Sequence, residues 1–280
     1  MTRAAFRDRA VYLSDGDALV LADLHVGRGE ASDVEFPLGE ADDLRDRLEA
    51  LLARYEPREV VFAGDVLHQF SRVSDRVVRS VEALTDTCRT AGARPVFVAG
   101  NHDTRLDACW NGPIHDGYRI ERTDATDESV TDDRTAATDE SATADTTETV
   151  DPSDPAVPDG EYAPSLAYPV VVRHGHETPP EAEARAAGTY LLGHDHPTIE
   201  VEGRRRPCYL HVPDATHGTN AVVLPAFNRL PAGVTVNGMR GSDFQSPFVT
   251  NPDDARPLVW DDDAGRVLPF PPLGEFRRLL

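Results

Sequence analysis

Short apolar runs that end in polar residues recur along this chain. They lie at residues 18–25, 59–65, 95–103, 169–176 and 189–196. Each run is rich in β-branched residues and bounded by glycine or proline, a pattern typical of a buried strand. The chain is therefore predicted to contain at least five strands whose last residues are polar.

Two segments between the first three runs carry apolar residues at the spacing of an amphipathic helix. These are Leu44, Leu48, Leu51, Leu52 and Tyr55 in one segment, and Val73, Val77, Val78, Val81, Leu84 and Cys88 in the other. Alternating strands and helices predict a parallel sheet with helical crossovers. Ligands collect at the carboxyl ends of the strands in such sheets, which is where the polar residues of the runs lie.

The helical spacing ends after residue 196. Residues 199–211, 220–227 and 233–236 have the pattern of further strands. We expect a second, more antiparallel sheet packed against the first, with 1–280 forming a single domain. Residues 245–280 are rich in proline and aspartate, and we expect them to wrap the surface as irregular structure.

Residues 121–164 differ in kind from the rest of the chain. They contain fourteen acidic residues against two arginines and are otherwise mostly threonine, alanine, serine and proline. Such a segment buries too little apolar surface to offset the entropy lost on ordering. We expect an acidic, low-complexity insertion that is disordered, and the sequence leaves open whether it also binds a partner.

The charge balance is strongly acidic. The chain has 49 acidic and 28 basic residues, a net charge of −21, and every basic residue is an arginine. The absence of lysine excludes Schiff-base chemistry, a phosphate-binding P-loop lysine and a lysine general base. The acid excess favours a halophilic protein of haloarchaeal origin, since a GC-rich genome would explain the arginines but not the acids.

The sequence also indicates the cellular compartment of the protein. The three cysteines form no C-x-x-C motif and are expected to be reduced thiols. The first residues lack the apolar core of a secretory signal, and no apolar run approaches the ~18 residues of a membrane span. We therefore expect a cytoplasmic protein without membrane contact, and the sequence indicates no particular protein partner.

The polar ends of the five runs are rich in metal-binding side chains. They read Asp23-Leu24-His25, Gly64-Asp65, Gly100-Asn101-His102-Asp103, His174-Gly175-His176 and Gly193-His194-Asp195-His196. Imidazoles with carboxylates suit Mn²⁺, Fe, Zn²⁺ or Ni²⁺ better than Ca²⁺ or Mg²⁺. An aspartate between two cations can bridge them, and a pair of cations is a standard device for hydrolysing phosphate esters.

The distribution of histidines supports a functional site. Seven of the ten, including His68 just after Gly64-Asp65, lie in or beside these motifs. A single histidine is more often a hydrogen-bonded structural residue, and this is the interpretation for His115, His211 and His217. Seven histidines at strand ends favour a shared metal site instead.

The series of motifs, in this order, resembles the calcineurin-like metallophosphoesterase superfamily over residues 15–225, apart from the acidic insertion. The resemblance implies an α/β fold, a four-layer α/β/β/α sandwich of two mixed sheets with flanking helices. It also implies two divalent metal ions, with Mn²⁺ the expected metal. By this resemblance one ion is held by Asp23, His25 and His196, the other by Asn101, His174 and His194, and Asp65 bridges them.

The same resemblance implies a hydrolytic reaction. A metal-bridging hydroxide would attack a phosphodiester or phosphomonoester, and His102 would protonate the leaving group or donate a hydrogen bond to it. Asp103 would fix the tautomer of His102. His68 and His176 are candidates for substrate contact, with a role outside the reaction left open for both.

A finer resemblance is to small archaeal phosphoesterases, which in turn resemble bacterial phosphoesterases encoded beside DNA ligases. It rests on residues 22–27 and on the late segment Leu224-Pro225-Ala226-Phe227-Asn228 with Gly233 after it. It implies a nucleotide or nucleic-acid-related substrate.

Three functions remain open: a phosphoesterase acting on nucleotide-type esters, a DNA repair nuclease, and a non-catalytic binding scaffold of the same fold. The scaffold is disfavoured because every motif residue is present. The chain has one basic cluster, Arg204-Arg205-Arg206, in a predicted turn. It either balances the acidic surface or grips a phosphate.

Overall fold

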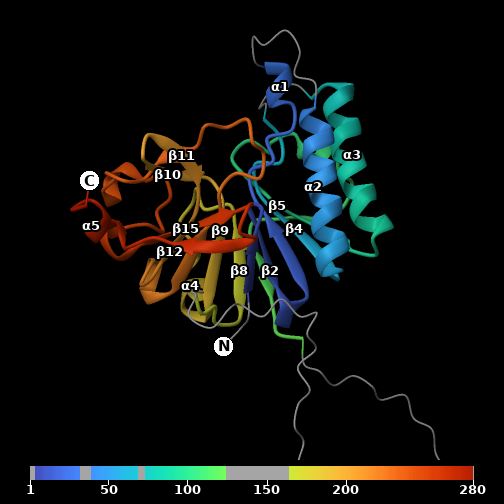
Figure 1. The fold of residues 1–280 in the computed structure, drawn as a ribbon. Helices are drawn as coiled ribbons and strands as arrows, with labels where there is room; N and C mark the ends of the chain where they lie inside the picture. Colours follow the sequence, from blue (N-terminus) through green and yellow to red (C-terminus); the bar gives the residue numbers. More distant parts are fainter. Residues whose placement is uncertain (1–3, 32–38, 69–72, 124–163, 280) are drawn as a thin grey trace, which may run out of the picture.

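The computed structural model describes residues 4–31, 39–68, 73–123 and 164–279, and two mixed sheets face each other within these ranges (Figure 1). The first sheet has the order β1 (Ala4–Arg7), β2 (Ala10–Leu13), β3 (Ala18–Leu21), β4 (Glu59–Ala63), β5 (Arg94–Val98) and β6 (Ile114–His115). Strands β3 to β6 are parallel, as the alternation of strands and helices predicts, while β1, β2 and β3 form an antiparallel meander.

The second sheet has seven strands. Its order is β16 (Arg266–Pro269), β15 (Arg256–Asp261), β12 (Tyr209–Val212), β13 (Asn220–Val223), β9 (Thr189–Leu192), β8 (Val170–Arg173) and β7 (Tyr118–Ile120). The central strands β8, β9 and β13 are parallel, and the other pairs are antiparallel. The sheet is therefore mixed, and its parallel centre brings the ends of β8 and β9 to one edge.

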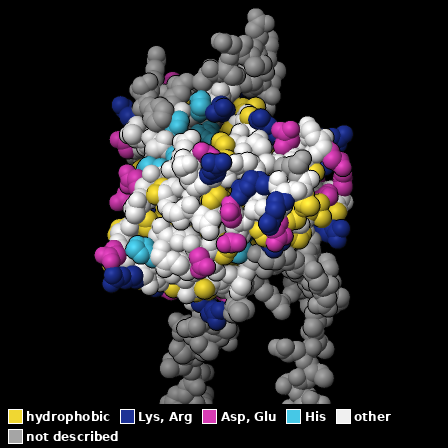
Figure 2. Space-filling view, turned by 90° about the vertical axis from the view of Figure 1, so that its left-hand side faces the viewer, with side chains coloured by type: hydrophobic (Ala, Val, Ile, Leu, Met, Phe, Trp, Pro, Cys, Tyr) yellow, Lys and Arg dark blue, Asp and Glu magenta, His cyan; other side chains and the backbone are white. Residues whose placement is uncertain are grey.

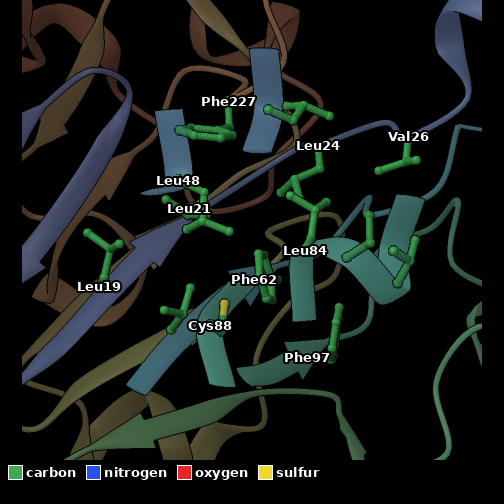
Figure 3. Packing of buried hydrophobic residues seen from close by; sticks show 14 of the residues in the cluster. Leu19, Leu21, Leu24, Val26, Leu48, Phe62, Leu84, Cys88, Phe97 and Phe227 are labelled. Atoms are coloured by element: carbon green, nitrogen blue, oxygen red, sulfur yellow. The ribbon is translucent and has the colours of Figure 1, made fainter. Parts of the chain in front are cut away.

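The layers are held by three apolar clusters. Helices α2 (Glu40–Tyr55) and α3 (Asp75–Thr90) cover the outer face of the first sheet, where Leu48 and Leu84 belong to the same buried cluster as Phe62 (Figures 1 and 3). The second cluster fills the space between the two sheets. The third lies on the outer face of the second sheet. The α/β fold predicted from the motifs is confirmed.

The fourth layer contains less helix than the first. It consists of a small sheet, two short helices and the C-terminal segment: β11 (Arg204–Pro207), β10 (Pro197–Val201), β14 (Val234–Thr235), α4 (Glu181–Ala186) and α5 (Leu273–Phe276). Phe248 and Phe276 supply apolar contacts to this layer. A further short helix, α1 (Arg28–Ala31), follows the first polar motif.

The expectation for residues 245–280 is wrong. They contain the hairpin of β15 and β16, which extends the second sheet beside β12, and the short helix α5. Leu258 and Val259 point to opposite faces and are both buried, so the strand is covered on each side. The strand itself contains Pro257 and Asp261, and these residue types obscured its short apolar segment in the sequence. Of the expected insertion 121–164, residues 124–163 lie outside the described residues.

The two predicted helices are present, with clear start signals only for the second. The Ser74 side chain accepts a hydrogen bond from the N–H of Val77 and caps α3, so Val73 precedes the helix. The longest helices that the structure describes have 16 residues, and none of the described helices has an apolar stretch that could cross a bilayer.

Candidate metal centre

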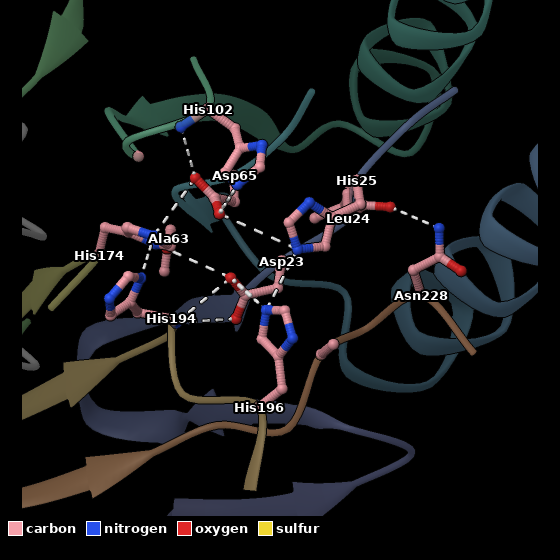
Figure 4. Close-up of polar contacts among 12 residues, drawn as sticks. Asp23, Leu24, His25, Ala63, Asp65, His102, His174, His194, His196 and Asn228 are labelled. Carbon is pink, nitrogen blue, oxygen red and sulfur yellow. Dashed lines mark hydrogen bonds and ion pairs between the residues drawn. The ribbon is translucent and has the colours of Figure 1, made fainter. Parts of the chain in front are cut away.

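The five polar motifs meet at one edge of the sandwich. They follow β3, β4 and β5 of the first sheet and β8 and β9 of the second, and their side chains converge between the sheets (Figure 4). This is the edge at which parallel strands present their carboxyl ends. The order of strands along the chain therefore explains why residues more than 170 positions apart become neighbours.

The first group consists of Asp23, His25 and His196, whose ligand atoms lie within 4.8 Å of one another. Nε2 of His196 is 3.1 Å from Oδ1 of Asp23 and 3.1 Å from Nε2 of His25. Asp23 and His25 are almost fully buried. The three residues that the family resemblance assigns to one metal are thus brought together.

The second group consists of Asp65, His174 and His194, again with ligand atoms within 4.8 Å. Nδ1 of His194 lies 3.2 Å from Nε2 of His174, and the Oδ1 atom of Asn101 lies 3.0 Å from the same nitrogen. The amide oxygen of Asn101 therefore completes the set expected for the second metal.

The Asp65 carboxylate lies between the two groups. Oδ1 is 3.3 Å from Nε2 of His174, while Oδ2 is 3.9 Å from Nε2 of His25. One oxygen thus faces each group, which is the arrangement of a bridging carboxylate. Oδ1 also accepts a hydrogen bond from the backbone N–H of His102 at 2.9 Å, which fixes its orientation.

The backbone is strained where the motifs end. Five of the seven predicted ligands have left-handed φ angles between +44° and +75°: Asp23, His25, Asp65, His194 and His196. Such conformations in non-glycine residues are unfavourable by about 1–3 kcal/mol each and concentrate at functional sites. Here they turn successive side chains towards the space between the sheets. The loops also brace each other, since the N–H of His25 donates to the carbonyl of Asp65 at 2.9 Å.

Two motif glycines allow close approach between the loops. A Cβ at Gly64 would lie 2.5 Å from the ring of His174, and a Cβ at Gly100 would lie 2.1 Å from the backbone nitrogen of Asp65. In both cases the neighbour is a predicted ligand from another motif. The glycines are therefore required by packing between motifs as well as by the turns they make.

Buried carboxylates make this region attractive to cations. Burial alone would raise the pKa values of Asp23 and Asp65, but the surrounding imidazoles hold both below the ordinary value. Burial would conversely lower the pKa of His174, yet Asp65 and Asp23 raise it to about 9. In the apo protein a proton on His174 therefore balances part of the charge of the two carboxylates.

Two other histidines, His25 and His194, have lowered pKa values, which favours the neutral ring that can bind a metal. Burial, followed for His194 by the charge of His174, lowers the pKa values of His25 and His194 to about 4. Ring nitrogens of His25 and His196 face each other at 3.1 Å, a contact that needs either a shared proton or a cation between lone pairs. The donor set and its charge therefore fit divalent metal ions.

The position of Asp103 corrects one expectation. Its Oδ1 accepts from the N–H of Leu67 and its Oδ2 from the N–H of Gly100, both at 2.9 Å, so the carboxylate braces the loops after β4 and β5. The His102 ring is oriented by another group: its Nδ1 lies 3.0 Å from the carbonyl oxygen of His68. A carbonyl can only accept, so Nδ1 carries hydrogen and Nε2 faces Asp65 Oδ2 at 3.8 Å.

The two candidate substrate contacts lie beside the metal-binding groups. One ring nitrogen of His68 lies within 4.8 Å of one ring nitrogen each of His25 and His102. The ring of His176 is centred 5.9 Å from that of His194, and the side chain is 27 % exposed. Both histidines are therefore placed at the margin of the centre.

Sequence reasoning missed the residues that support the first loop. The Nδ2 group of Asn228 donates to the carbonyl of Leu24 at 2.8 Å and to Oε1 of Glu40 at 2.9 Å. The N–H of Phe227 donates to the carbonyl of Ala22 at 2.8 Å. The late Leu-Pro-Ala-Phe-Asn segment thus clamps the loop that carries Asp23 and His25, a role that its sequence alone did not reveal.

Two further missed residues are Asp195 and Arg28. The carboxylate of Asp195 accepts from the N–H groups of Gln245 and Ser246, which fastens the C-terminal segment to the last motif. Arg28 follows His25 in a turn closed by its own N–H on the carbonyl of His25 at 3.0 Å. The sequence singled out neither residue: Asp195 was only the position between two predicted ligands, and Arg28 lay just outside the first motif.

The other singled-out residues lie outside the centre. Residues 204–206 belong to the strand β11 and not to a turn, are exposed, and include an ion pair of Arg205 with Glu200 at 3.7 Å. His115, His211 and His217 belong to neither metal-binding group among the described residues. The three cysteines are free thiols.

Histidine side chains reach the surface of the molecule. Figure 2 draws one face of the molecule and shows histidine side chains in its upper part, with arginine and acidic side chains around and below them. His196 and His102 have side-chain exposures of 17 % and 22 %. These two side chains of the centre are therefore partly exposed to solvent.

Comparison with known proteins agrees with the fold and the motifs. The family model described as calcineurin-like phosphoesterase matches residues 17–198, which include every predicted metal ligand. No curated protein is similar enough to this chain to count as a match.

One solved structure shares this fold. The crystal structure of the Pseudomonas putida nuclease MPE is 20 % identical, covers 96 % of this chain and 100 % of its own, and has a TM-score of 0.53. Yfce, a phosphoesterase from E. coli, is 12 % identical, with 91 % of this chain and 98 % of its own covered and a TM-score of 0.39. The first likeness supports the fold, and the second is too distant to add to it.

Proposed function

The chain belongs to the calcineurin-like phosphoesterase family and is a metal-dependent phosphoric ester hydrolase, and from this premise we propose that it is a dinuclear phosphoesterase. Its substrates are phosphodiesters or phosphomonoesters of nucleotide or nucleic-acid type. The observation that carries the proposal is the Asp65 carboxylate, which turns one oxygen towards each of two His/Asp groups.

The residues divide into two metal sites. Asp23, His25 and His196 would hold one ion, and Asn101, His174 and His194 would hold the other, with Asp65 shared. Two divalent cations, if held by these residues, would supply Lewis-acid chemistry: an activated water at neutral pH and neutralisation of charge on the phosphoryl oxygens. Imidazole-rich sites of this kind suit Mn²⁺, and Fe, Zn²⁺ and Ni²⁺ are the other candidates.

His102 acts at the leaving group. Its Nδ1–H is held by the carbonyl of His68, so the imidazolium form presents a proton at Nε2 on the side of Asp65. This proton is available to the departing oxygen, which makes His102 the general acid. The carboxylate of Asp103 contributes by fixing the backbone between Gly100 and Leu67.

The acidic composition supports a salt-rich cytoplasm as the working environment, and assays belong at high KCl. At ~1 M salt the Debye length is about 3 Å, so the net charge of −21 repels an anionic substrate little. Charge alone therefore does not exclude nucleotides or nucleic acids as substrates.

The test is parallel hydrolysis of a bis-aryl phosphodiester and an aryl phosphomonoester, with Mn²⁺ titrated into chelator-treated protein. Activity that saturates near two ions per chain supports the proposal. Diester cleavage directs the search to nucleotides and nucleic acids, and monoester cleavage alone directs it to nucleotide monophosphates. Activity that saturates with one ion, or none with any of the four metals, overturns it.

A further inference from the structure

One short stretch of chain, residues 227–235, holds both loops of the first metal-binding group. Near its start, the side-chain amide of Asn228 donates to the carbonyl of Leu24, the residue between the first two ligands, at 2.8 Å (Figure 4). Near its end, the N–H of Val234 donates to the carbonyl of His196 at 3.0 Å. We call this stretch the supporting segment.

The second metal-binding group is held by contacts of another origin. The N–H of Gly193, for example, donates to the carbonyl of His174 at 3.0 Å. Among the residues that the structure describes, no hydrogen bond joins the supporting segment to Asn101, His174 or His194. A change in the supporting segment can therefore act on one group of ligands and spare the other.

The first loop depends on such contacts because of its backbone conformation. Asp23 and His25 have left-handed φ angles of +57° and +44°, which non-glycine residues keep only where their surroundings impose them. The N–H of His25 donates to the carbonyl of Asp65 at 2.9 Å. The carbonyl of Asp23 instead accepts from the N–H of Asn228 at 3.4 Å. Loss of the bonds to the supporting segment would let the loop relax and displace both ligands.

The side chain of Asn228 is fixed in one orientation by its partners. Its Nδ2 group faces two atoms that only accept, the carbonyl oxygen of Leu24 at 2.8 Å and Oε1 of Glu40 at 2.9 Å. Its Oδ1 accepts from the N–H of Leu230 at 2.8 Å. Glu40, at the start of α2, is held in turn by the N–H of Gly29, which donates to its Oε2 at 3.0 Å. Asn228 is buried, so an oxygen in place of Nδ2 would face two other oxygens with no water between them.

A glycine allows the far end of the supporting segment to approach His196. Gly233 has a φ angle of +67°, and a Cβ there would lie 2.7 Å from the carbonyl oxygen of His196 and 2.3 Å from the side chain of Thr198. His196 itself has a left-handed φ of +44°. A larger residue at position 233 would push the N–H of Val234 away from the carbonyl that it holds.

We propose that the supporting segment sets the metal affinity of the first group and not that of the second. Asn228 and Glu40 are positioning residues for the first loop, and Gly233 is one for the loop of His196. The inference rests on the proposed function and adds a difference between its two metal sites. The supporting segment lies beyond residues 17–198, the range that the family model matches.

The test is a calorimetric titration of Mn²⁺ into chelator-treated protein, with Asn228→Asp as the main variant. This substitution keeps the shape of the side chain but turns an oxygen towards the carbonyl of Leu24 and the carboxylate of Glu40. Loss of a partner outside the ligand set commonly weakens metal affinity, so one site should weaken by about 10- to 100-fold while the other keeps its affinity. Gly233→Ala should weaken the same site through His196.

Two backgrounds identify the site that changes. His194→Ala removes a ligand of the second group, so the ion that remains occupies the first group, and Asn228→Asp should weaken it by the full factor. His196→Ala removes a ligand of the first group, and in that background Asn228→Asp should have little further effect. Electron paramagnetic resonance of Mn²⁺ is an independent readout, because a lone ion and a neighbouring pair of ions have different spectra.

Asn237→Asp is the matched control. Asn237 is also buried, and its side chain bonds to the backbone N–H and carbonyl of Glu200 at 2.9 and 2.8 Å, outside both metal-binding groups. The variant should lose stability but keep both ions. Glu40→Gln should weaken the first site less than Asn228→Asp does. The two changes combined should recover part of the affinity, because an amide again faces a carboxylate between these positions.

Equal weakening of both sites by Asn228→Asp, or of neither, overturns the inference and leaves the proposed function intact. A loss of metal in Asn237→Asp as large as that in Asn228→Asp also overturns it, since reduced stability would explain both. A wild type that binds fewer than two ions contradicts the proposed function. The inference then survives only if Asn228→Asp weakens a single bound ion and Asn237→Asp does not.

Discussion

Nε2 of His174 lies 3.3 Å from Oδ1 of Asp65, although the two residues come from different sheets of the sandwich. The contact helps to raise the pKa of His174 and to lower that of Asp65. The second oxygen of Asp65 faces His25. One carboxylate thereby links the metal-binding groups.

Removing this link should remove metal binding. Asp65→Asn keeps the shape of the side chain but loses the charge that two cations share, so metal content should fall from about two ions per chain to one or fewer. Elemental analysis after dialysis measures the ratio. Asp86→Asn, at an exposed position on α3, is the matched control and should keep both ions. Two tightly bound ions in Asp65→Asn would contradict the bridging role.

Replacing His102 should separate chemistry from metal binding. His102→Ala leaves both metal-binding groups intact but removes the proton donor, so turnover should fall about 10²- to 10⁴-fold on substrates with poor leaving groups. Substrates with acidic phenol leaving groups should be affected much less, since they depart without a proton. A series of aryl diesters of graded leaving-group pKa measures this, and an equal loss across the series would rule out general acid catalysis.

Arg47 should be important for stability. Its buried guanidinium binds both oxygens of Asp8 at 2.7 and 2.9 Å and donates to the carbonyl of Phe227 at 2.6 Å. Arg47→Met leaves Asp8 with only the longer contact to Arg229 at 3.5 Å and should lower the free energy of unfolding by about 3 kcal/mol. Urea titration measures the change. Arg45→Met, on the exposed side of the same helix, should change it by less than about 0.5 kcal/mol.

The same substitution should weaken metal affinity, because Phe227 holds the carbonyl of Ala22 next to Asp23. Unchanged metal affinity in Arg47→Met, measured at a temperature where the variant is folded, would show that the clamp does not position the first loop.

His211 should make stability fall in weak acid. Burial, and next the charge of Arg256, lower the pKa of His211 to about 4. Between that value and its ordinary pKa near ~6.5 the unfolded chain binds a proton that the native state does not, so stability decreases as pH falls. From pH 7 to 5 this residue should account for a loss of about 2 kcal/mol.

The measurement is the free energy of unfolding at both pH values for wild type and His211→Gln. The variant should lose less stability than wild type over this interval, because it carries no titrating ring at that position. Equal losses in the two proteins would show that His211 is not the source.

The local pattern of apolar and polar residues was sufficient to predict the main strands and helices of the fold. The β-branched runs became β3, β4, β5, β8 and β9, and the spacing of Leu44 and Leu48 marked α2. The hairpin of β15 and β16 was missed because Leu258 and Val259 are buried on opposite faces, which removes the alternation that marks a half-exposed strand.

The sequence by itself determined the donor types, their order and their places at strand ends, because those depend on residues close together along the chain. Only the tertiary structure decided which donors share a group and how Asp65 faces both. It also moved Asp103 from the His102 ring to two backbone N–H groups, and it placed Asn228 behind the loop that carries Asp23 and His25. These relations depend on contacts between loops from two sheets, and no periodicity within one segment encodes such contacts.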